Sequence, residues 1–261
     1  MSRIDVYRHG LMVGWSDFRL FWSLRSWFFG WMLRILTNAF AWVLVGRMLG
    51  SREQQEYLLV GNAVAVGAAA ALWASNAVGW SRYDGTHALM VIAPSSLAPA
   101  VLGRTSIWLL NGVATSLTAF VVLMLAFGYR PPLSGAFVPG LVVLVCASSF
   151  CFALVMGALV GRHTRFRNLV LDVSGTLLLA LCGVSVPVAF WPAPVQVVAQ
   201  LLPLTHGLAA IRALLAGNGA STVLGHAALE AVVGIGWLVL ALLLMDRMAE
   251  RGRRDGSIES F

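Results

Sequence analysis

The sequence predicts an all-α, polytopic membrane protein that forms a single transmembrane domain over residues 1–261. Of its residues, 59% are hydrophobic and 11% are charged, and the mean hydropathy is +0.82. Soluble chains are about half apolar and about a quarter charged, so this chain has too little charge to cover a water-exposed surface. The composition therefore excludes a cytosolic enzyme, a secreted disulfide scaffold and a disordered regulator.

Residues 1–25 predict an amphipathic helix that lies in the membrane interface. An apolar stripe with two tryptophans recurs every three or four residues, and arginines flank it. The stripe consists of Ile4, Tyr7, Leu11, Trp15, Phe18 and Trp22. Helices with this pattern bind the boundary between lipid headgroups and acyl chains. The alternative is a helix that packs against a partner protein.

Six further stretches are apolar over roughly the 20 residues that a transmembrane helix needs. They are 27–49, 57–79, 104–127, 137–160, 169–190 and 223–245. Polar or turn-forming residues separate consecutive spans. The second span also carries small residues at four-residue steps, which favour close helix packing in lipid. These are Gly61, Ala65 and Ala69.

Residues 191–222, before the last span, predict a helical hairpin that dips into the outer leaflet. Pro192 precedes one short apolar segment, and Pro203 precedes a second one that ends at Gly217. Proline at a helix start and glycine beyond its end are the expected boundaries. Each segment is too short to cross a bilayer, which is typical of re-entrant or interfacial helices.

The arginines orient the chain, because basic loops stay on the cytoplasmic side of a membrane. With a cytoplasmic N-terminus, 13 of the 18 arginines fall on that side. They are Arg3, Arg8, Arg19, Arg25, Arg82, Arg104, Arg162, Arg165, Arg167, Arg247, Arg251, Arg253 and Arg254. Both termini are therefore predicted to be cytoplasmic. The chain contains no lysine, so it lacks the residue with which a P-loop holds the phosphates of ATP.

Two segments carry distinctive motifs. The segment after the second span holds Gly85-Thr86, Leu89, Pro94 and Ser96. The segment before the last span holds Gly183, Pro187, Pro192, Leu202-Pro203, Arg212 and Gly217. Together with six spans and an amphipathic N-terminal helix, these motifs resemble the permease subunits of type-2 ATP-binding-cassette (ABC) exporters. The chain differs from that family at Tyr83-Asp84, where a glutamate and a basic residue are usual.

The resemblance implies a non-catalytic, multi-pass subunit of the bacterial cytoplasmic membrane. Two permease chains, identical or different, would pair and bind two copies of an ABC ATPase subunit, which would hold ATP and magnesium. Residues 80–100 would form the segment that couples to the ATPase, through Arg82, Tyr83, Asp84, Gly85, Thr86 and Pro94. Pro187, Pro192, Pro203 and Arg212 would belong to an extracellular gate.

The cargo that the resemblance implies is an amphipathic small molecule, drug-like or antibiotic-like, or a lipid or glycan. This chain itself would hold no cofactor and no metal, and it would bind membrane lipid rather than nucleic acid. Its three cysteines, Cys146, Cys151 and Cys182, lie inside apolar stretches and are interpreted as small core residues.

Polar residues inside the spans are candidates for a transport pathway or for hydrogen bonds between helices. They include Asn38, Asn62, Asn76, Asn111, Thr115, Ser148, Ser149, Thr176 and Glu230, of which Asn38, Asn62, Thr176 and Glu230 are the pathway candidates. His226 and Glu230 stand four residues apart on one helix face, which predicts a structural pair. The alternatives are an integral-membrane enzyme or a proton-driven secondary transporter that uses this pair.

Overall fold

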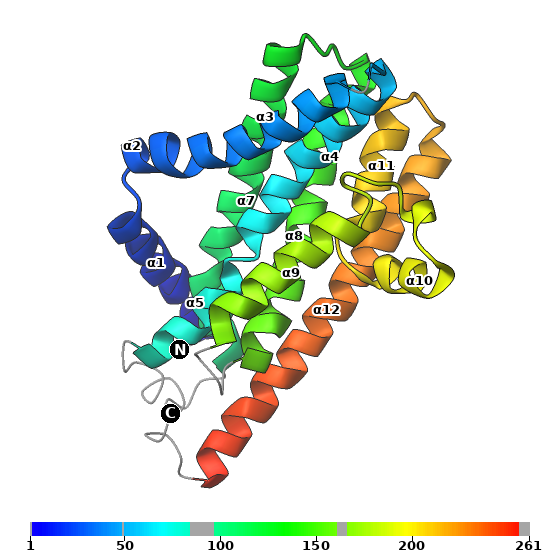
Figure 1. The fold of residues 1–261 in the computed structure, drawn as a ribbon. Helices are drawn as coiled ribbons and strands as arrows, with labels where there is room; N and C mark the ends of the chain where they lie inside the picture. Colours follow the sequence, from blue (N-terminus) through cyan, green and yellow to red (C-terminus); the bar gives the residue numbers. More distant parts are fainter. Residues whose placement is uncertain (1, 49, 84–96, 161–165, 256–261) are drawn as a thin grey trace.

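The computed structural model describes residues 2–48, 50–83, 97–160 and 166–255, and Figure 1 shows their arrangement. Within these ranges every regular element is a helix, and there is no strand. The first elements are α1 (Arg3–Phe21), α2 (Leu24–Ser26), the π-helical turn η1 (Trp27–Met32) and α3 (Leu33–Met48). Then follow α4 (Arg52–Ala71), α5 (Ala74–Tyr83), α7 (Leu97–Phe127), η2 (Leu133–Phe137) and α8 (Val138–Val160). The last are α9 (Arg167–Leu181), η4 (Val188–Phe190), α10 (Ala193–Leu201), α11 (Thr205–Leu215) and α12 (Ala220–Asp255).

Five helical segments are long and apolar enough to cross a membrane, which confirms the predicted class. They are Leu24–Met48, Arg52–Val78, Ala98–Phe127, Leu133–Val160 and Ala220–Met248. A sixth arises if α10 and α11, which meet at 88°, count as one broken span. The beginning of α1 and the end of α12 lie at the same end of the bundle (Figure 1).

The predicted span 169–190 is wrong in its second half. Helix α9 has 15 residues, about 22 Å at 1.5 Å per residue, which is shorter than the roughly 30 Å of a bilayer core. The helix stops because Gly183 adopts a φ of 80°, a left-handed conformation that glycine reaches without steric cost. Hydropathy does not detect this stop, because the residues beyond it remain apolar.

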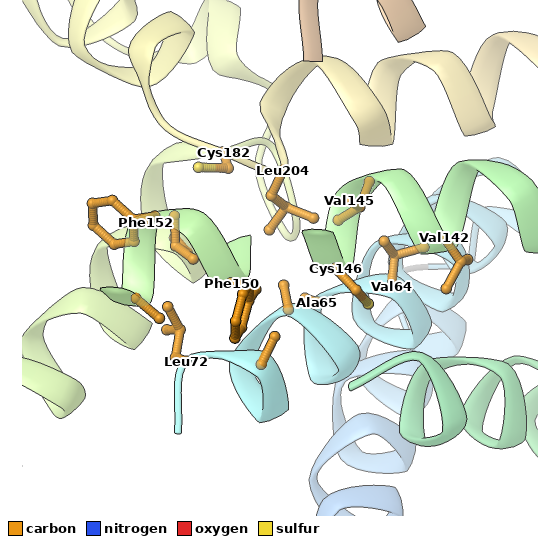
Figure 2. Packing of buried hydrophobic residues seen from close by; sticks show 14 of the residues in the cluster. Val64, Ala65, Leu72, Val142, Val145, Cys146, Phe150, Phe152, Cys182 and Leu204 are labelled. Atoms are coloured by element: carbon orange, nitrogen blue, oxygen red, sulfur yellow. The ribbon is translucent and has the colours of Figure 1, made fainter. Parts of the chain in front are cut away.

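Helix α4 forms the centre of the bundle. In the Arg52–Val78 segment 83% of the apolar window is buried, against 22% in the first and the last segment. Figure 2 shows Val64, Ala65 and Leu72 packed among α8 residues such as Cys146 and Phe150. Ala65 belongs to the predicted small-residue face and is buried. Close packing of small residues stabilises helix bundles in lipid, where burial alone does not distinguish protein from acyl chains.

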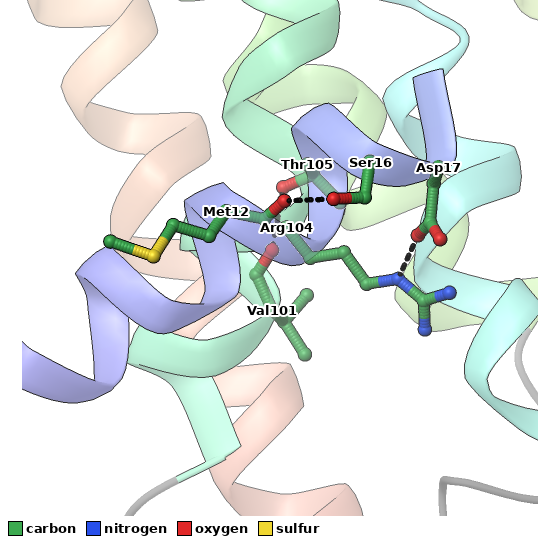
Figure 3. A network of polar contacts seen from close by, with 6 residues as sticks. All are labelled: Met12, Ser16, Asp17, Val101, Arg104 and Thr105. Carbon is green, nitrogen blue, oxygen red and sulfur yellow. Dashed lines mark hydrogen bonds and ion pairs between the residues drawn. The ribbon is translucent and has the colours of Figure 1, made fainter. Parts of the chain in front are cut away.

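The N-terminal helix α1 packs directly on the first half of α7. A Cβ at Gly14 would overlap the carbonyl oxygen of Arg104, and a Cβ at Gly10 would come 2.7 Å from that of Ala100. The Asp17 carboxylate accepts a hydrogen bond from Arg104 Nε at 2.7 Å across the same contact (Figure 3). The amphipathic helix predicted over 1–25 is therefore present as α1, and it is fixed to the bundle on one face.

The surface of α1 away from α7 is exposed and carries apolar as well as basic side chains. It includes Ile4 at 71% exposure, Trp15 at 51% and Leu20 at 85%. Of the predicted stripe residues, Ile4 and Trp15 are thus more than half exposed, whereas Tyr7 and Phe18 contact α7 beside the two glycines. An exposed apolar face beside basic residues is typical of a helix that also contacts lipid.

Candidate functional site

The most unusual polar group among the described residues is the carboxylate of Glu230, which is 0% exposed in the first third of α12. Its Oε1 accepts a hydrogen bond from the backbone N–H of Leu204 at 2.9 Å, and its Oε2 accepts one from Gly207 at 2.8 Å. The hydroxyl of Ser148 on α8 donates a third hydrogen bond to Oε1. A buried carboxylate is tolerated only where such donors replace water.

The two backbone donors, Leu204 and Gly207, belong to the N-cap and first turn of α11, which begins inside the bundle. The first N–H groups of any helix lack partners within the helix, and in a bilayer core each unsatisfied group costs several kcal/mol. Glu230 supplies the missing acceptor from a different helix, and its negative charge also suits the positive end of the α11 dipole. The carboxylate therefore acts as a cap that allows a helix to start at this depth.

The backbone around the cap is tightly constrained. Leu204 adopts a φ of 85°, a conformation that costs a non-glycine residue free energy and persists only where its surroundings enforce it. A Cβ at Gly207 would overlap a methyl group of Val145 and approach Glu230 Cγ to 3.2 Å. The close approach of α11 to α8 and α12 thus requires glycine at position 207.

Arg212, in the last turn of α11, connects this helix to two other segments of the chain by hydrogen bonds. Its guanidinium donates to the carbonyl oxygens of Gly183 at 2.7 Å, Tyr57 at 3.1 Å and Val184 at 3.2 Å. The guanidinium carbon also lies 3.4 Å from the centre of the Tyr57 ring, and the Tyr57 hydroxyl donates to Gly183 O at 2.7 Å. Cation–π contact and charged hydrogen bonds reinforce each other at such a site. Arg212 therefore holds α11 against α4 and the turn that follows α9.

The predicted hairpin has the expected helical pieces. Helices α10 and α11 begin after Pro192 and shortly after Pro203, and Gly217 beyond α11 has a φ of 75°. Pro187 and Pro192 are exposed, whereas Pro203 is buried at the bend between the two helices. Of the four predicted gate residues, Pro203 and Arg212 thus belong to the buried junction and the other two lie at its surface.

The four predicted pathway residues do not form one site. Asn38 on α3 and Thr176 on α9 are exposed, and Thr176 donates only to a carbonyl oxygen of its own helix, that of Asp172 at 2.8 Å. Asn62 is buried and donates to Leu58 O at 2.9 Å, also within its own helix. Among the described residues no hydrogen bond joins any two of the four.

The predicted His226–Glu230 pair is not formed. The hydrogen bonds that Glu230 accepts come from α8 and α11, and His226 Nδ1 is buried without a hydrogen-bond partner in the described structure. The expectation that polar span residues link helices is confirmed for Asn111 and Thr115. These accept from the indole N–H groups of Trp27 at 2.7 Å and Trp31 at 3.4 Å.

The predicted coupling residues fall largely outside the described residues, where Asp84, Gly85, Thr86 and Pro94 lie. Arg82 and Tyr83 form the last turn of α5. That turn lies at the same end of the bundle as the beginning of α1 (Figure 1).

No family model matches the chain, and no curated protein or solved structure is significantly similar to it. Among the described residues no group of three or more His, Cys, Asp or Glu side chains could hold a metal ion. The three cysteines are free thiols, with Cys146 and Cys182 buried in the core. The chemistry of the site is thus one of hydrogen bonding and charge within an apolar bundle.

The sequence pointed to Glu230 and Arg212 but not to their partners. Ser148 was one of several polar span positions, and nothing marked Tyr57, Leu204 or Gly207 as members of these networks. A glycine two residues after Leu-Pro-Leu-Thr is the only local signal near the cap.

Proposed function

We propose that this protein is the transmembrane subunit of an ABC exporter. It would move an amphipathic small molecule, lipid or glycan across the cytoplasmic membrane by alternating access. The two motifs that resemble type-2 ABC permeases support this proposal, as do the five long apolar segments. The absence of lysine also fits a subunit whose ATP is hydrolysed by a partner ATPase.

The observation that carries the transport assignment is the broken segment α10–α11 with its buried cap. A bend of 88° inside an apolar bundle is costly unless the freed backbone groups are satisfied, and here Glu230 satisfies two of them. Discontinuous helices that start within the membrane are characteristic of transporters, where they allow one part to move against another. The capped junction would be the pivot of such a movement.

The proposed topology has six traversals with both termini in the cytoplasm. The beginning of α1 and the end of α12 lie at one end of the bundle, which suits an even number of traversals (Figure 1). Five come from the long apolar segments, and α9 with the turn that follows it would supply the sixth, as in the predicted span 169–190. The arginine distribution would place the termini inside and the α10–α11 hairpin near the outer surface.

The end of α5 would connect the pathway to the ATPase. Closure of the ATPase dimer would push on residues 82–96 and on α1, which the Asp17–Arg104 ion pair fixes to α7. The α5–α7 unit would then tilt relative to α11 and α12. Hydrolysis itself would involve no residue of this chain.

Co-purification tests the subunit assignment. The full chain, isolated with its associated proteins, should retain a P-loop ATPase, and replacement of residues 82–86 by alanine should release it. The isolated chain should show no ATPase activity of its own. Retention of the ATPase by the alanine variant would reject this segment as the dock, and ATP turnover by the chain alone would overturn the assignment.

Cysteine labelling tests the topology. In a variant without the three native cysteines, a cysteine at position 221 should react with an impermeant maleimide added outside, and one at position 257 only after permeabilisation. The reverse pattern would refute the proposed orientation. Uptake driven by an imposed pH difference without nucleotide would favour the proton-driven alternative instead.

A further inference from the structure

A cavity of about 890 Å³ lies between the N-terminal segment and α7. It is lined mainly by apolar and aromatic side chains, including Trp15, Phe18, Trp22, Ile107 and Leu110. Ligand pockets that enclose a small molecule usually measure ~300–1,000 Å³, so the cavity has the size of a binding site. We call this cavity the α1–α7 groove.

The groove is open on one side and closed on the other. Ile107 on its inner wall is only 4% exposed, whereas Trp15, Leu24 and Leu110 are 51%, 89% and 57% exposed. In a membrane these last three side chains would face acyl chains, so the opening leads into the lipid. A long apolar chain can therefore enter from the bilayer without crossing the protein.

The position of the groove along α7 sets its depth. Arg104, which pairs with Asp17, lies about one helical turn before the wall of the groove. The α7 residues of that wall run from Ile107 to Ala114. Seven further residues correspond to about 10 Å along a helix. A charged pair followed by an apolar wall of this length matches the step from headgroups to the first half of an acyl chain.

Two arginines, Arg19 and Arg25, lie at the edge of this apolar surface. Both are exposed, and neither has a hydrogen bond or ion pair within the described structure. Both carboxylates of α1 are already used, since Asp17 binds Arg104 and Asp5 caps the first turn of α1 at its opposite end. The rim of the groove therefore carries two positive charges without a negative partner.

The groove itself is preformed. Ser23 caps α2, Trp27 Nε1 donates to Asn111 on α7 at 2.7 Å, and Trp22 packs edge-on against Trp31 with ring centres 5.5 Å apart. These contacts fix the segment that follows α1 in place relative to α7 and so define the walls of the groove. A preformed site binds its ligand with a smaller loss of conformational entropy.

We infer that the α1–α7 groove binds one anionic phospholipid, with its phosphate on Arg19 and Arg25 and an acyl chain along Trp22, Ile107 and Leu110. Charge complementarity decides the occupant, because an apolar chain alone would leave both arginines without a counter-charge. A zwitterionic lipid would bring its own cation to the rim and bind less well. This inference depends on residence in a membrane and not on ATP-driven export.

Native mass spectrometry of the full chain in detergent provides the test, with phosphatidylglycerol and phosphatidylcholine of the same acyl chains as probes. The wild-type chain should retain phosphatidylglycerol preferentially. The variant R19Q/R25Q should retain it about fivefold less for each arginine removed, as expected for a basic residue at a lipid surface. The control R3Q/R8Q carries the same change in charge on α1, away from the groove, and should retain the wild-type preference.

Filling the groove tests the acyl-chain contact without changing the charge. Ala114→Phe and Leu110→Trp, both at exposed wall positions, should each reduce the retention of both lipids. Inorganic phosphate in excess should not displace the bound phosphatidylglycerol. If thermal melting shows that one of the two filling variants does not fold, the lipid retention of the other variant decides the test.

Three results would overturn the inference. An equal loss of phosphatidylglycerol in R3Q/R8Q and R19Q/R25Q would show only diffuse attraction to a basic surface. Unchanged lipid retention in both filling variants would show that the groove is not the site. Displacement by inorganic phosphate would identify a simple anion site at the rim instead of a lipid site.

Discussion

The substitution Glu230→Gln tests the central structural feature, the cap on α11. Glutamine keeps one oxygen, which can still accept from Leu204 N–H and Ser148 at the Oε1 position. Its amide nitrogen then faces the N–H of Gly207, which Oε2 accepts at 2.8 Å in the wild-type protein. One buried donor loses its partner, and this costs ~1–3 kcal/mol. Alanine would leave both N–H groups unpaired and should cost about twice as much.

Two measurements detect the loss of this hydrogen bond. The melting temperature in detergent should fall for Glu230→Gln and fall further for Glu230→Ala. Hydrogen exchange of peptides that cover 203–215 should accelerate, because the first turn of α11 opens without its cap. Glu53→Gln is the matched control, since Glu53 is exposed at the start of α4 and should change neither quantity. If Glu230→Gln had the same melting temperature and the same hydrogen exchange as Glu53→Gln, the capping argument would be refuted.

Three further predictions concern other contacts. Gly14→Ala should displace α1, because its methyl would overlap a carbonyl oxygen of α7, and limited proteolysis of the N-terminal segment should accelerate. Arg212→Lys should lower stability by ~2 kcal/mol in thermal melting, because the single nitrogen of lysine cannot reach the carbonyl oxygens that two guanidinium nitrogens contact and has no plane to stack on the Tyr57 ring. Hydrogen bonds from Ser2 hold the pKa of Asp5 below its usual 3.8, so this cap should stabilise α1 at neutral pH. This stabilisation of α1 should be lost as the pH falls from 3.8 through the lowered pKa of Asp5. In an NMR titration of Ser2→Ala, the pKa of Asp5 should move back up.

Each of these predictions has an outcome that contradicts it. Gly236→Ala is the control for the first, because a Cβ there meets nothing within 4 Å; proteolysis that is equal in both variants would argue against close packing at position 14. Arg130→Lys, at an exposed arginine, is the control for the second, and an equally small effect of both substitutions would remove Arg212 from its proposed role. If the pKa of Asp5 were unchanged in Ser2→Ala, the hydrogen bonds of the cap would not be the cause of the lowered pKa.

The class of protein could be predicted from the sequence because it depends on local composition. Long apolar stretches, turn residues between them and an amphipathic N-terminal stripe are each visible within a short window. The proline and glycine boundaries of the hairpin were also local, and α10 and α11 start and stop close to them. The failed span 169–190 shows the limit of this approach. Its apolar residues continue past Leu181, while the chain leaves the helix at Gly183.

The sequence by itself determined that this chain is an all-α bundle with apolar helices and a short broken pair before the last helix. Only the tertiary structure decided what Glu230 and Arg212 bind, because their partners lie 23 to 155 residues away in the sequence. It also decided that two glycines, along with Tyr7 and Phe18 of the apolar stripe, fix α1 to α7. The physical reason is that hydropathy and periodicity report on one helix at a time, whereas capping, ion pairing and close packing depend on which helices meet.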